Sequence, residues 1–147
     1  ATLDTFSGEA TYLAGIRERC FDVMYVNLNL ADSFPVERAI PAAAERGMAV
    51  FVRECFMKGA LFAMGDQVGL TDHDRLARVA LRWCLTRPGV TAAVVGAHDV
   101  DQMRNNLRAL DEPDLTDEDR QVIETLRRSA RFAEYAERKR AQWYQEG

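Results

Sequence analysis

The sequence has few residues of the kinds that build metal sites and disulfide frameworks. Among its 147 residues are three cysteines, Cys20, Cys55 and Cys84, and two histidines, His73 and His98. The cysteines form no C-x-x-C pair and their number is odd, so we expect reduced thiols in a cytoplasmic protein rather than disulfides. Because the two histidines lie far apart in the sequence, no His/Cys metal site is expected.

Long apolar runs and a strong excess of one charge are also lacking. No run approaches the roughly 18–20 apolar residues that a membrane-spanning helix needs, and no signal peptide is visible. The formal net charge of -4 argues against a dedicated nucleic-acid binder. With 48% hydrophobic and 29% charged residues, the composition is ordinary for one globular domain. The sequence therefore predicts neither a membrane nor a nucleic-acid partner.

The sequence instead alternates short apolar runs with longer amphipathic segments, which is typical of βαβ units around a parallel sheet. The expected strands cover residues 21–28, 48–52 and 91–95, with a partial strand over residues 1–4. The expected helices cover residues 9–19, 36–46, 71–86, 100–110 and 116–144. Ser7 and Thr116 are expected N-caps, and Gly47 is expected to end the second helix. The runs at 48–52 and 91–95 are expected to be buried on both faces.

Four segments in the right order and spacing resemble the aldo-keto reductase family. They are residues 4–9, the run FDVMYVNLNL at 21–30, the run GMAVFVRECFMKGAL at 47–61, and residues 80–106 with ALRWCLTRPGV followed by VVGA. They are similar to the family's chain from the end of strand five to the start of helix eight. The resemblance implies an α/β fold that is half of a TIM (β/α)8 barrel, with parallel strands alternating with helices. We expect one C-terminal half-barrel domain over residues 1–147, with a helical tail from about residue 116.

The resemblance also implies a site for NADPH or NADH. In such barrels ligands bind at the C-terminal ends of the strands, and the loops after strands seven and eight hold phosphate through backbone N–H groups and helix N-termini. By resemblance, those loops are residues 53–61 and 96–106. The expected cofactor-binding residues are Tyr25, Arg53, Glu54, Phe56, Lys58, Gly59, Gly96, His98, Gln102, Asn105 and Asn106.

Several of these residues depart from the family's pattern. Arg53 stands where many members have a Tyr that stacks on nicotinamide, and Glu54 stands where many have a Ser that contacts phosphate. His98 replaces an Arg often used for the adenosine 2′-phosphate, and Asn105 replaces a Glu often used for adenine. Tyr25 replaces a Gln that contacts the carboxamide. The choice between NADPH and NADH therefore stays open.

Each functional interpretation has a structural alternative. Arg53 and Glu54 could form a surface ion pair, Lys58 could be a solvated loop charge, and His98 could be a polar residue at a helix start. Tyr25 could fill the core instead of facing the barrel mouth.

Other residues are expected to be structural. Cys20 and Cys84 are expected in the core, Cys55 is expected to be structural within the ligand loop, and His73 is expected to be exposed. The basic tail, with Phe132, Tyr135 and Trp143, has two interpretations. It is either a solvated last helix or a helix that docks on the barrel or on a partner.

The function implied by the resemblance is an NAD(P)H-dependent oxidoreductase that reduces aldehydes or ketones, with this chain as its cofactor half. The family's catalytic Asp, Tyr, Lys and His lie on strands two to four, which this chain does not include, so no catalytic residue is assigned. The alternative is a catalytically inactive half-barrel that acts as a binding or structural subunit. A third hypothesis is a new site at the mouth of a homodimer, formed by Tyr25, Arg53, Glu54 or His98.

A half-barrel also predicts an association. Closure is what removes the open edges of a barrel sheet, so an isolated half exposes them. The chain is therefore expected to be a fragment, to pair with a complementary half-barrel subunit, or to close one barrel as a homodimer.

Overall fold

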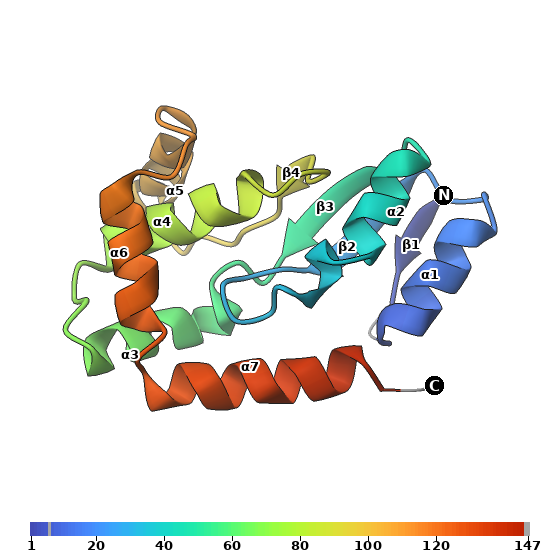
Figure 1. Ribbon diagram of the computed structural model, residues 1–147. Helices are drawn as coiled ribbons and strands as arrows, with labels where there is room; N and C mark the ends of the chain where they lie inside the picture. Colours follow the sequence, from blue (N-terminus) through green and yellow to red (C-terminus); the bar gives the residue numbers. More distant parts are fainter. Residues whose placement is uncertain (6, 146–147) are drawn as a thin grey trace.

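Four parallel strands form the sheet of the computed structural model, which describes residues 1–5 and 7–145. They are β1 (Thr2–Asp4), β2 (Val23–Asn27), β3 (Ala49–Arg53) and β4 (Ala92–Ala93), side by side in sequence order (Figure 1). Tyr25 of β2 pairs with Asp4 of β1 and with Phe51 of β3. The expected α/β fold of parallel strands alternating with helices is confirmed. Phe6, in the first segment that resembles the family, lies outside the described residues.

Helices follow every strand, and the last one returns to the start of the chain. They are α1 (Glu9–Arg17), η1 (Phe34–Val36), α2 (Ala39–Glu45), η2 (Met57–Gly59), α3 (Ala60–Gln67), α4 (His73–Leu85), α5 (Val100–Leu107), η3 (Arg108–Leu110), α6 (Asp117–Leu126) and α7 (Ala130–Trp143). In Figure 1, α7 runs along the bottom of the view toward α1. The ring centroids of Trp143 and Tyr12 lie 5.4 Å apart.

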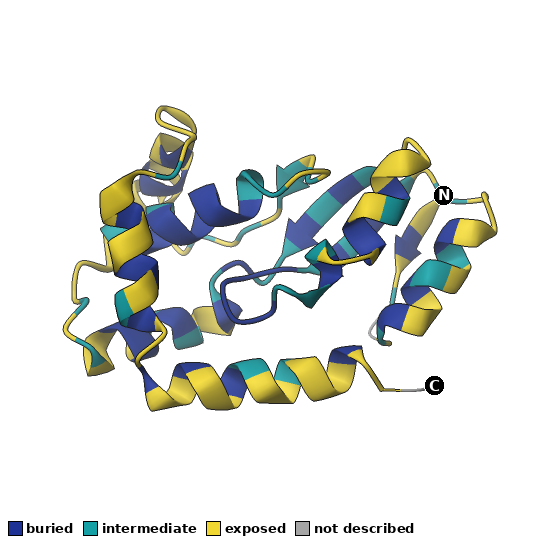
Figure 2. Cartoon of the chain, in the orientation of Figure 1, coloured by how far each residue is buried: buried dark blue, intermediate teal, exposed yellow. Residues whose placement is uncertain are grey.

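One face of the sheet is more deeply buried than the other. Met24 and Val26 on β2 and Val50 and Val52 on β3 are buried in the same core as Ile40 of α2. The residues that alternate with them along both strands are only partly buried (Figure 2). Successive side chains of a strand point to opposite faces, so the helices cover the first face, while the second face, which carries Tyr25 and Phe51, stays partly open.

This alternation corrects the expected burial of two strands. Residues 48–52 are not buried on both faces, because every second residue of β3 is only partly covered. Residues 91–95 form only the two-residue β4, whose residues are also partly buried. β4 is an edge strand of the sheet, and an edge lacks a neighbour on one side.

Near the N-terminus, the structure shortens two expected elements. The N-cap of α1 is Gly8 rather than Ser7, and the helix ends at Arg17 instead of reaching residue 19. Cys20 is exposed, so its expected core position is wrong. The reason is that the chain leaves the helix before Cys20 and turns, with Arg19 at φ 57°, toward the start of β2 at Val23.

Two expected helices are each divided in two. Residues 36–46 form η1 and α2, separated at Arg38, whose φ of -139° is not helical. Residues 116–144 form α6 and α7, because Ser129 is extended and begins a new helix. The Ser129 hydroxyl donates a 2.7 Å hydrogen bond to Gln67 at the end of α3, which fixes the bend.

The sequence does not predict α3. Its N-cap is Gly59 with φ 90°, and no side chain caps the helix. Its mostly apolar run has neither a polar start signal nor a charged face. Tertiary packing forms the helix instead, with Leu61 and Met64 buried in the core.

Other local signals are confirmed. Thr116 begins α6 through a reciprocal capping box with Asp119. Gly47 ends α2 with φ 70°, a backbone conformation that favours glycine. Cys84 is fully buried, and His73 is exposed at the start of α4, where Asp72 is the N-cap.

A buried ion pair fastens α6 to α4. The guanidinium of Arg82 donates to both carboxylate oxygens of Asp119, at 3.0 and 2.8 Å. Burial acts to raise the pKa of Asp119, but the hydrogen bonds from Arg82 and from the Thr116 backbone outweigh it and leave the pKa below its ordinary value. Two parallel hydrogen bonds also fix the relative orientation of the helices.

We predict that Arg82→Met lowers the free energy of unfolding at pH 7 by about 3–5 kcal/mol, because it leaves a buried carboxylate unpaired. Urea unfolding followed by circular dichroism measures this change. Arg120→Met is the control, since Arg120 makes an exposed pair with Asp117 and such pairs contribute less than about 1 kcal/mol. The folded pKa of Asp119 is lowered, so its contribution is present at neutral pH and is lost as the pH falls through that pKa. Equal losses for the two variants contradict the prediction.

Candidate functional site

The C-terminal ends of three strands are joined by Arg53. Its Nε donates to Asn27 Oδ1 on β2 at 2.9 Å, and its guanidinium pairs with Asp4 on β1 at 2.7 and 3.0 Å. A surface ion pair between Arg53 and Glu54 is therefore not what the structure shows. On the neighbouring strands β2 and β3, the rings of Tyr25 and Phe51 pack edge to face, with their centroids 5.3 Å apart. Tyr25 is partly buried, on the face of the sheet opposite to that of Met24 and Val26.

The loop after β3 is strained. Glu54, Met57 and Lys58 have φ values of 60°, 54° and 56°, and Gly59 has φ 90°. Non-glycine residues in this region cost free energy, and such residues cluster at functional sites. The carbonyl of Glu54 accepts a 3.1 Å hydrogen bond from Asn29 Nδ2, which supports the unusual backbone.

A cavity of about 550 Å³, here called the loop cavity, lies between this loop, α4 and the loop after β4. Its walls include every expected cofactor-binding residue except Tyr25 and Arg53. The expected residues that line it are Glu54, Phe56, Lys58, Gly59, Gly96, His98, Gln102, Asn105 and Asn106. Positions from two loops that are about 40 residues apart in the sequence therefore meet around one space.

The β4 side of the loop cavity is held by hydrogen bonds. The Asp99 side chain caps α5 by accepting from the Gln102 N–H at 2.8 Å, and Gln102 Oε1 accepts from the His98 N–H at 3.0 Å. Asn105 connects α5 to α4, since its Nδ2 donates to the Asp74 carbonyl at 2.9 Å and its Oδ1 accepts from Arg78. The N-terminal end of α5, where a helix favours negative charge, is thereby fixed beside the cavity.

An aromatic wall of the loop cavity was not expected from the sequence. Phe62 of α3 lies 5.7 Å from Phe56 and 5.2 Å from the ring of His73. His73 in turn contacts Asp66 at 2.7 Å. No sequence signal pointed to Phe62 or His73, because their approach depends on α3.

A second cavity of about 880 Å³, here called the mouth cavity, lies between the strand ends and α7. Polar and aromatic side chains from distant parts of the chain surround it, among them Tyr12, Asn27, Asp32, Tyr135 and Lys139. Phe132, Tyr135 and Trp143 of α7 are buried. Of the two interpretations of the tail, docking on the barrel is thus the observed one.

Lys139 is buried with two carboxylates in the mouth cavity. Its Nζ lies 3.3 Å from Glu54 and 3.8 Å from Asp32, and none of the three side chains is more than 14% exposed. Burial raises the pKa of Asp32 to about 6; the Lys139 charge opposes the rise and Glu54 adds to it. Sequence reasoning missed this cluster, because its members lie far apart in the chain.

Two tyrosines of the mouth cavity are poor acids. Burial raises the pKa of Tyr12 to about 12, and its hydroxyl lies 2.8 Å from the carbonyls of Thr5 and Tyr25. Burial, with the charges of Glu54 and Asp32, also raises the pKa of Tyr135 to about 12. Both hydroxyls therefore stay protonated at neutral pH.

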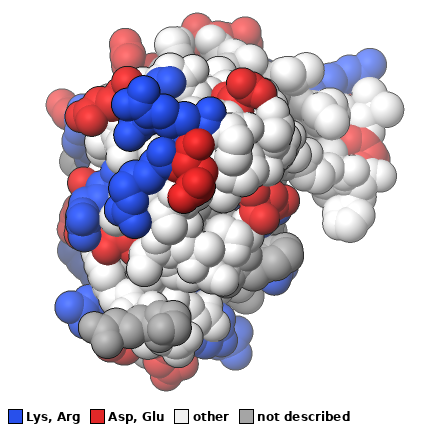
Figure 3. Space-filling view, turned by 90° about the vertical axis from the view of Figure 1, so that its right-hand side faces the viewer, with Lys and Arg blue, Asp and Glu red and all other residues white. Residues whose placement is uncertain are grey.

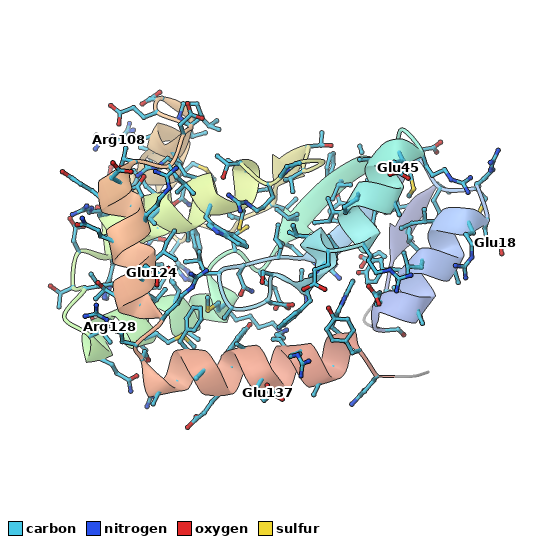
Figure 4. All side chains as sticks on the ribbon, viewed as in Figure 1. Glu18, Glu45, Arg108, Glu124, Arg128 and Glu137 are labelled. Atoms are coloured by element: carbon cyan, nitrogen blue, oxygen red, sulfur yellow. The ribbon has the colours of Figure 1, made fainter. Side chains whose placement is uncertain are left out.

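The outer surface carries charged side chains of both signs. In Figure 3, Lys and Arg side chains lie interspersed with Asp and Glu beside a broad uncharged area. The labelled side chains Glu124, Arg128 and Glu137 project from the outer faces of the C-terminal helical region (Figure 4). Within residues 1–5 and 7–145, no group of three metal-binding side chains of the His, Cys, Asp or Glu type comes together. No helix in this part of the chain is long and apolar enough to span a bilayer.

Comparison with known proteins identifies the relatives of this architecture. The family model described as "Aldo/keto reductase family" matches residues 66–128. The structure of aldo-keto reductase AKR11C1 from Bacillus halodurans, in its apo and holo forms, is 25% identical over 80% of this chain, with a TM-score of 0.59. Over these residues the chain is similar to the aldo-keto reductases. The resemblance predicted from the sequence is confirmed.

The similarity covers less than half of each of the solved structures named here. The chain spans 47% of the apo and 46% of the holo AKR11C1 chain, in agreement with the expected half of a TIM barrel. A thermostable aldo-keto reductase, Tm1743, solved with the inhibitor epalrestat, has a TM-score of 0.52 at 18% identity over 72% of this chain and 40% of its own, and supports the fold alone. No curated protein matches the chain.

We predict that Asp32→Asn stabilises the chain at pH 7.5 and has little effect at pH 4. The folded pKa of Asp32, about 6, lies above the ordinary value of about 3.9. Its stabilising contribution is therefore complete below about pH 4 and is lost as the pH rises through 6. Two pKa units correspond to a gain of up to about 3 kcal/mol in the free energy of unfolding. Urea titrations across this range measure the gain.

Asp101→Asn is the control for this prediction, because Asp101 is an exposed residue paired with Arg104. It should leave the pH dependence unchanged. A gain for Asp32→Asn that is the same at pH 4 and pH 7.5 would contradict the assignment.

Proposed function

We propose that the chain is the cofactor-binding half of an NAD(P)H-dependent oxidoreductase that reduces aldehydes or ketones. The loop cavity carries this proposal. It gathers residues at the positions where the family holds its dinucleotide, from the two loops that follow the last two strands. Ligands of such barrels bind at this end of the strands.

The cavity has the features that a dinucleotide needs. A Cβ atom added to Gly59 or Gly96 would meet no atom within 4 Å, so the backbone at both glycines is open to a ligand. Lys58 and His98 supply donors for phosphate oxygens, and the N-terminus of α5 favours their charge. Phe56 and Phe62 offer aromatic surface to a base. A bound nicotinamide supplies the hydride for carbonyl reduction.

Glu54 does not prevent anion binding. A carboxylate beside phosphate is unfavourable when it is unpaired, but Glu54 has Lys58 on one oxygen and Lys139 on the other, each at 3.3 Å. His98 and His73 are the groups available to distinguish a 2′-phosphate, and we propose NADPH as the first coenzyme to test and NADH as the second.

The proposal requires closure of the barrel. The edges at β1 and β4 have no neighbour within the described chain. The outer face of α5 and η3 carries an apolar stripe of Val100, Met103, Leu107 and Leu110, each 44–63% exposed. We propose that a complementary half-barrel, or a second copy of this chain, covers the stripe and extends the sheet. The free cysteines suit a cytoplasmic setting.

A catalytically inactive binding or structural subunit is the second candidate. The observation that favours it is that the Arg53 side chain is held by Asp4 and Asn27. Many family members present an aromatic ring to nicotinamide at this position. In that case the chain pairs with a partner without turnover.

We predict saturable NADPH binding by this chain in isothermal titration calorimetry. Lys58→Gln and His98→Gln should each weaken binding roughly tenfold, as expected when one charge-assisted hydrogen bond is lost. His98→Gln should weaken NADPH binding more than NADH binding. Arg104→Gln is the matched control, because Arg104 is an exposed cation of α5 outside the lining. A folded chain that binds neither coenzyme contradicts the proposal.

We also predict that the chain associates through the apolar stripe. Sedimentation should show a complex, either of two copies or with a complementary half, and Met103→Glu should dissociate it, because a charge is then buried in an apolar contact. Glu134→Lys, an exposed change on α7, should leave the mass unchanged. A monomer at all concentrations that gains no mass with a complementary half contradicts the proposed closure.

A further inference from the structure

The two cavities share a wall. Of the described residues that line them, Glu54 and Lys58 alone border both the loop cavity and the mouth cavity. Both residues belong to the strained loop after β3, with φ values of 60° and 56°. A ligand that binds in one cavity therefore contacts side chains that also line the other cavity.

The carboxylate of Glu54 is divided between two lysines. Its Oε1 lies 3.3 Å from Lys58 Nζ, and its Oε2 lies 3.3 Å from Lys139 Nζ. The two partners differ in burial, since Lys58 is 77% exposed and Lys139 is 14% exposed. An exposed ion pair contributes little and is readily exchanged, whereas a buried one is costly to break.

Lys139 connects this wall to α7. Besides Glu54, it faces Asp32 at 3.8 Å and lies 5.6 Å from the centre of the Tyr135 ring. Because the backbone of Glu54 is held by Asn29, the side chain is the part of this residue that can respond to a ligand. The Glu54–Lys139 pair is thus a direct electrostatic connection between the loop after β3 and the last helix.

We propose that Glu54 is a positioning residue that couples anion binding in the loop cavity to the seating of α7 over the mouth cavity. The inference rests on the proposed function, because the anion is a phosphate of the dinucleotide. A phosphate that binds Lys58 repels the Glu54 carboxylate, and Lys139 is then the remaining cationic partner of Glu54. The pair with α7 is thereby strengthened. Coupling is reciprocal, so a firmly seated α7 also favours the phosphate.

A double-mutant cycle with NADPH tests the coupling on the full chain. Lys139→Met should weaken NADPH binding, measured by isothermal titration calorimetry, at least about fivefold, because Glu54 then competes with phosphate for Lys58. In the Glu54→Gln background the same Lys139→Met change should have no effect beyond about twofold. Arg138→Met is the matched control: Arg138 is a cation of the same helix that lines the mouth cavity and lies over Tyr135 at 5.0 Å, and it should leave the Kd unchanged.

Loss of Lys139 leaves two buried carboxylates together, which threatens the fold. The cycle is therefore repeated with Asp32→Asn in all members, so that one of these charges is removed. Folding of each variant is verified by circular dichroism before titration. Equal weakening by Lys139→Met in both backgrounds, or no weakening at all, overturns the coupling while leaving the proposed function intact.

A fluorescence measurement reports directly on α7. The sequence has two tryptophans, so Trp83→Phe leaves Trp143 of α7, at the mouth cavity, as the single reporter. NADP⁺, which unlike NADPH does not absorb at the emission wavelength of tryptophan, should change Trp143 emission in this background and should not change it after Glu54→Gln, although calorimetry still detects binding. Binding without a Trp143 response in the Trp83→Phe chain overturns the inference alone. No binding by the unmodified chain overturns the proposed function and the inference together.

Discussion

The burial of Lys139 between Asp32 and Glu54 is the interaction on which the shape of the site depends. One ammonium group is the shared partner of two carboxylates that have little access to water. Without it, the loop after β2 and the loop after β3 would repel each other, and α7 would lose its charged anchor. The mouth cavity exists because this cluster and the contact of Trp143 with Tyr12 hold the last helix across the strand ends.

The sequence predicts the parts of the fold that depend on local patterns. The strands at β2 and β3, the cap at Thr116 and the end of a helix at Gly47 all follow from neighbouring residues. The resemblance also selects residues of two loops that the structure brings together around the loop cavity. What it misses depends on distant contacts. The sequence of α3 has no capping residue and no charged face that would predict a helix. The ion pair between Lys139 and Glu54 joins residues that are 85 positions apart in the sequence.

The predicted double burial of the strands fails for a related reason. A run of apolar residues predicts that a strand is buried on both faces of its sheet, but it does not identify the segments that bury each face. In this chain the helices supply one side, and the face with Tyr25 and Phe51 remains partly open. Arg53 shows the same limit, because its partners Asp4 and Asn27 come from other strands and become apparent only when the sheet is assembled.

The return of α7 to the start of the chain has a consequence for biosynthesis. The strands pair with the next strand along the chain, as Val23–Asn27 does with Ala49–Arg53, so these partners are available before α7 has been synthesised. The mouth cavity cannot form then, because Tyr144 reaches back 107 residues to Glu37 and Trp143 reaches back to Tyr12. A nascent chain therefore exposes the Asp32 and Glu54 carboxylates to water until α7 leaves the ribosome. The costly burial of charge is therefore deferred until α7 has been synthesised.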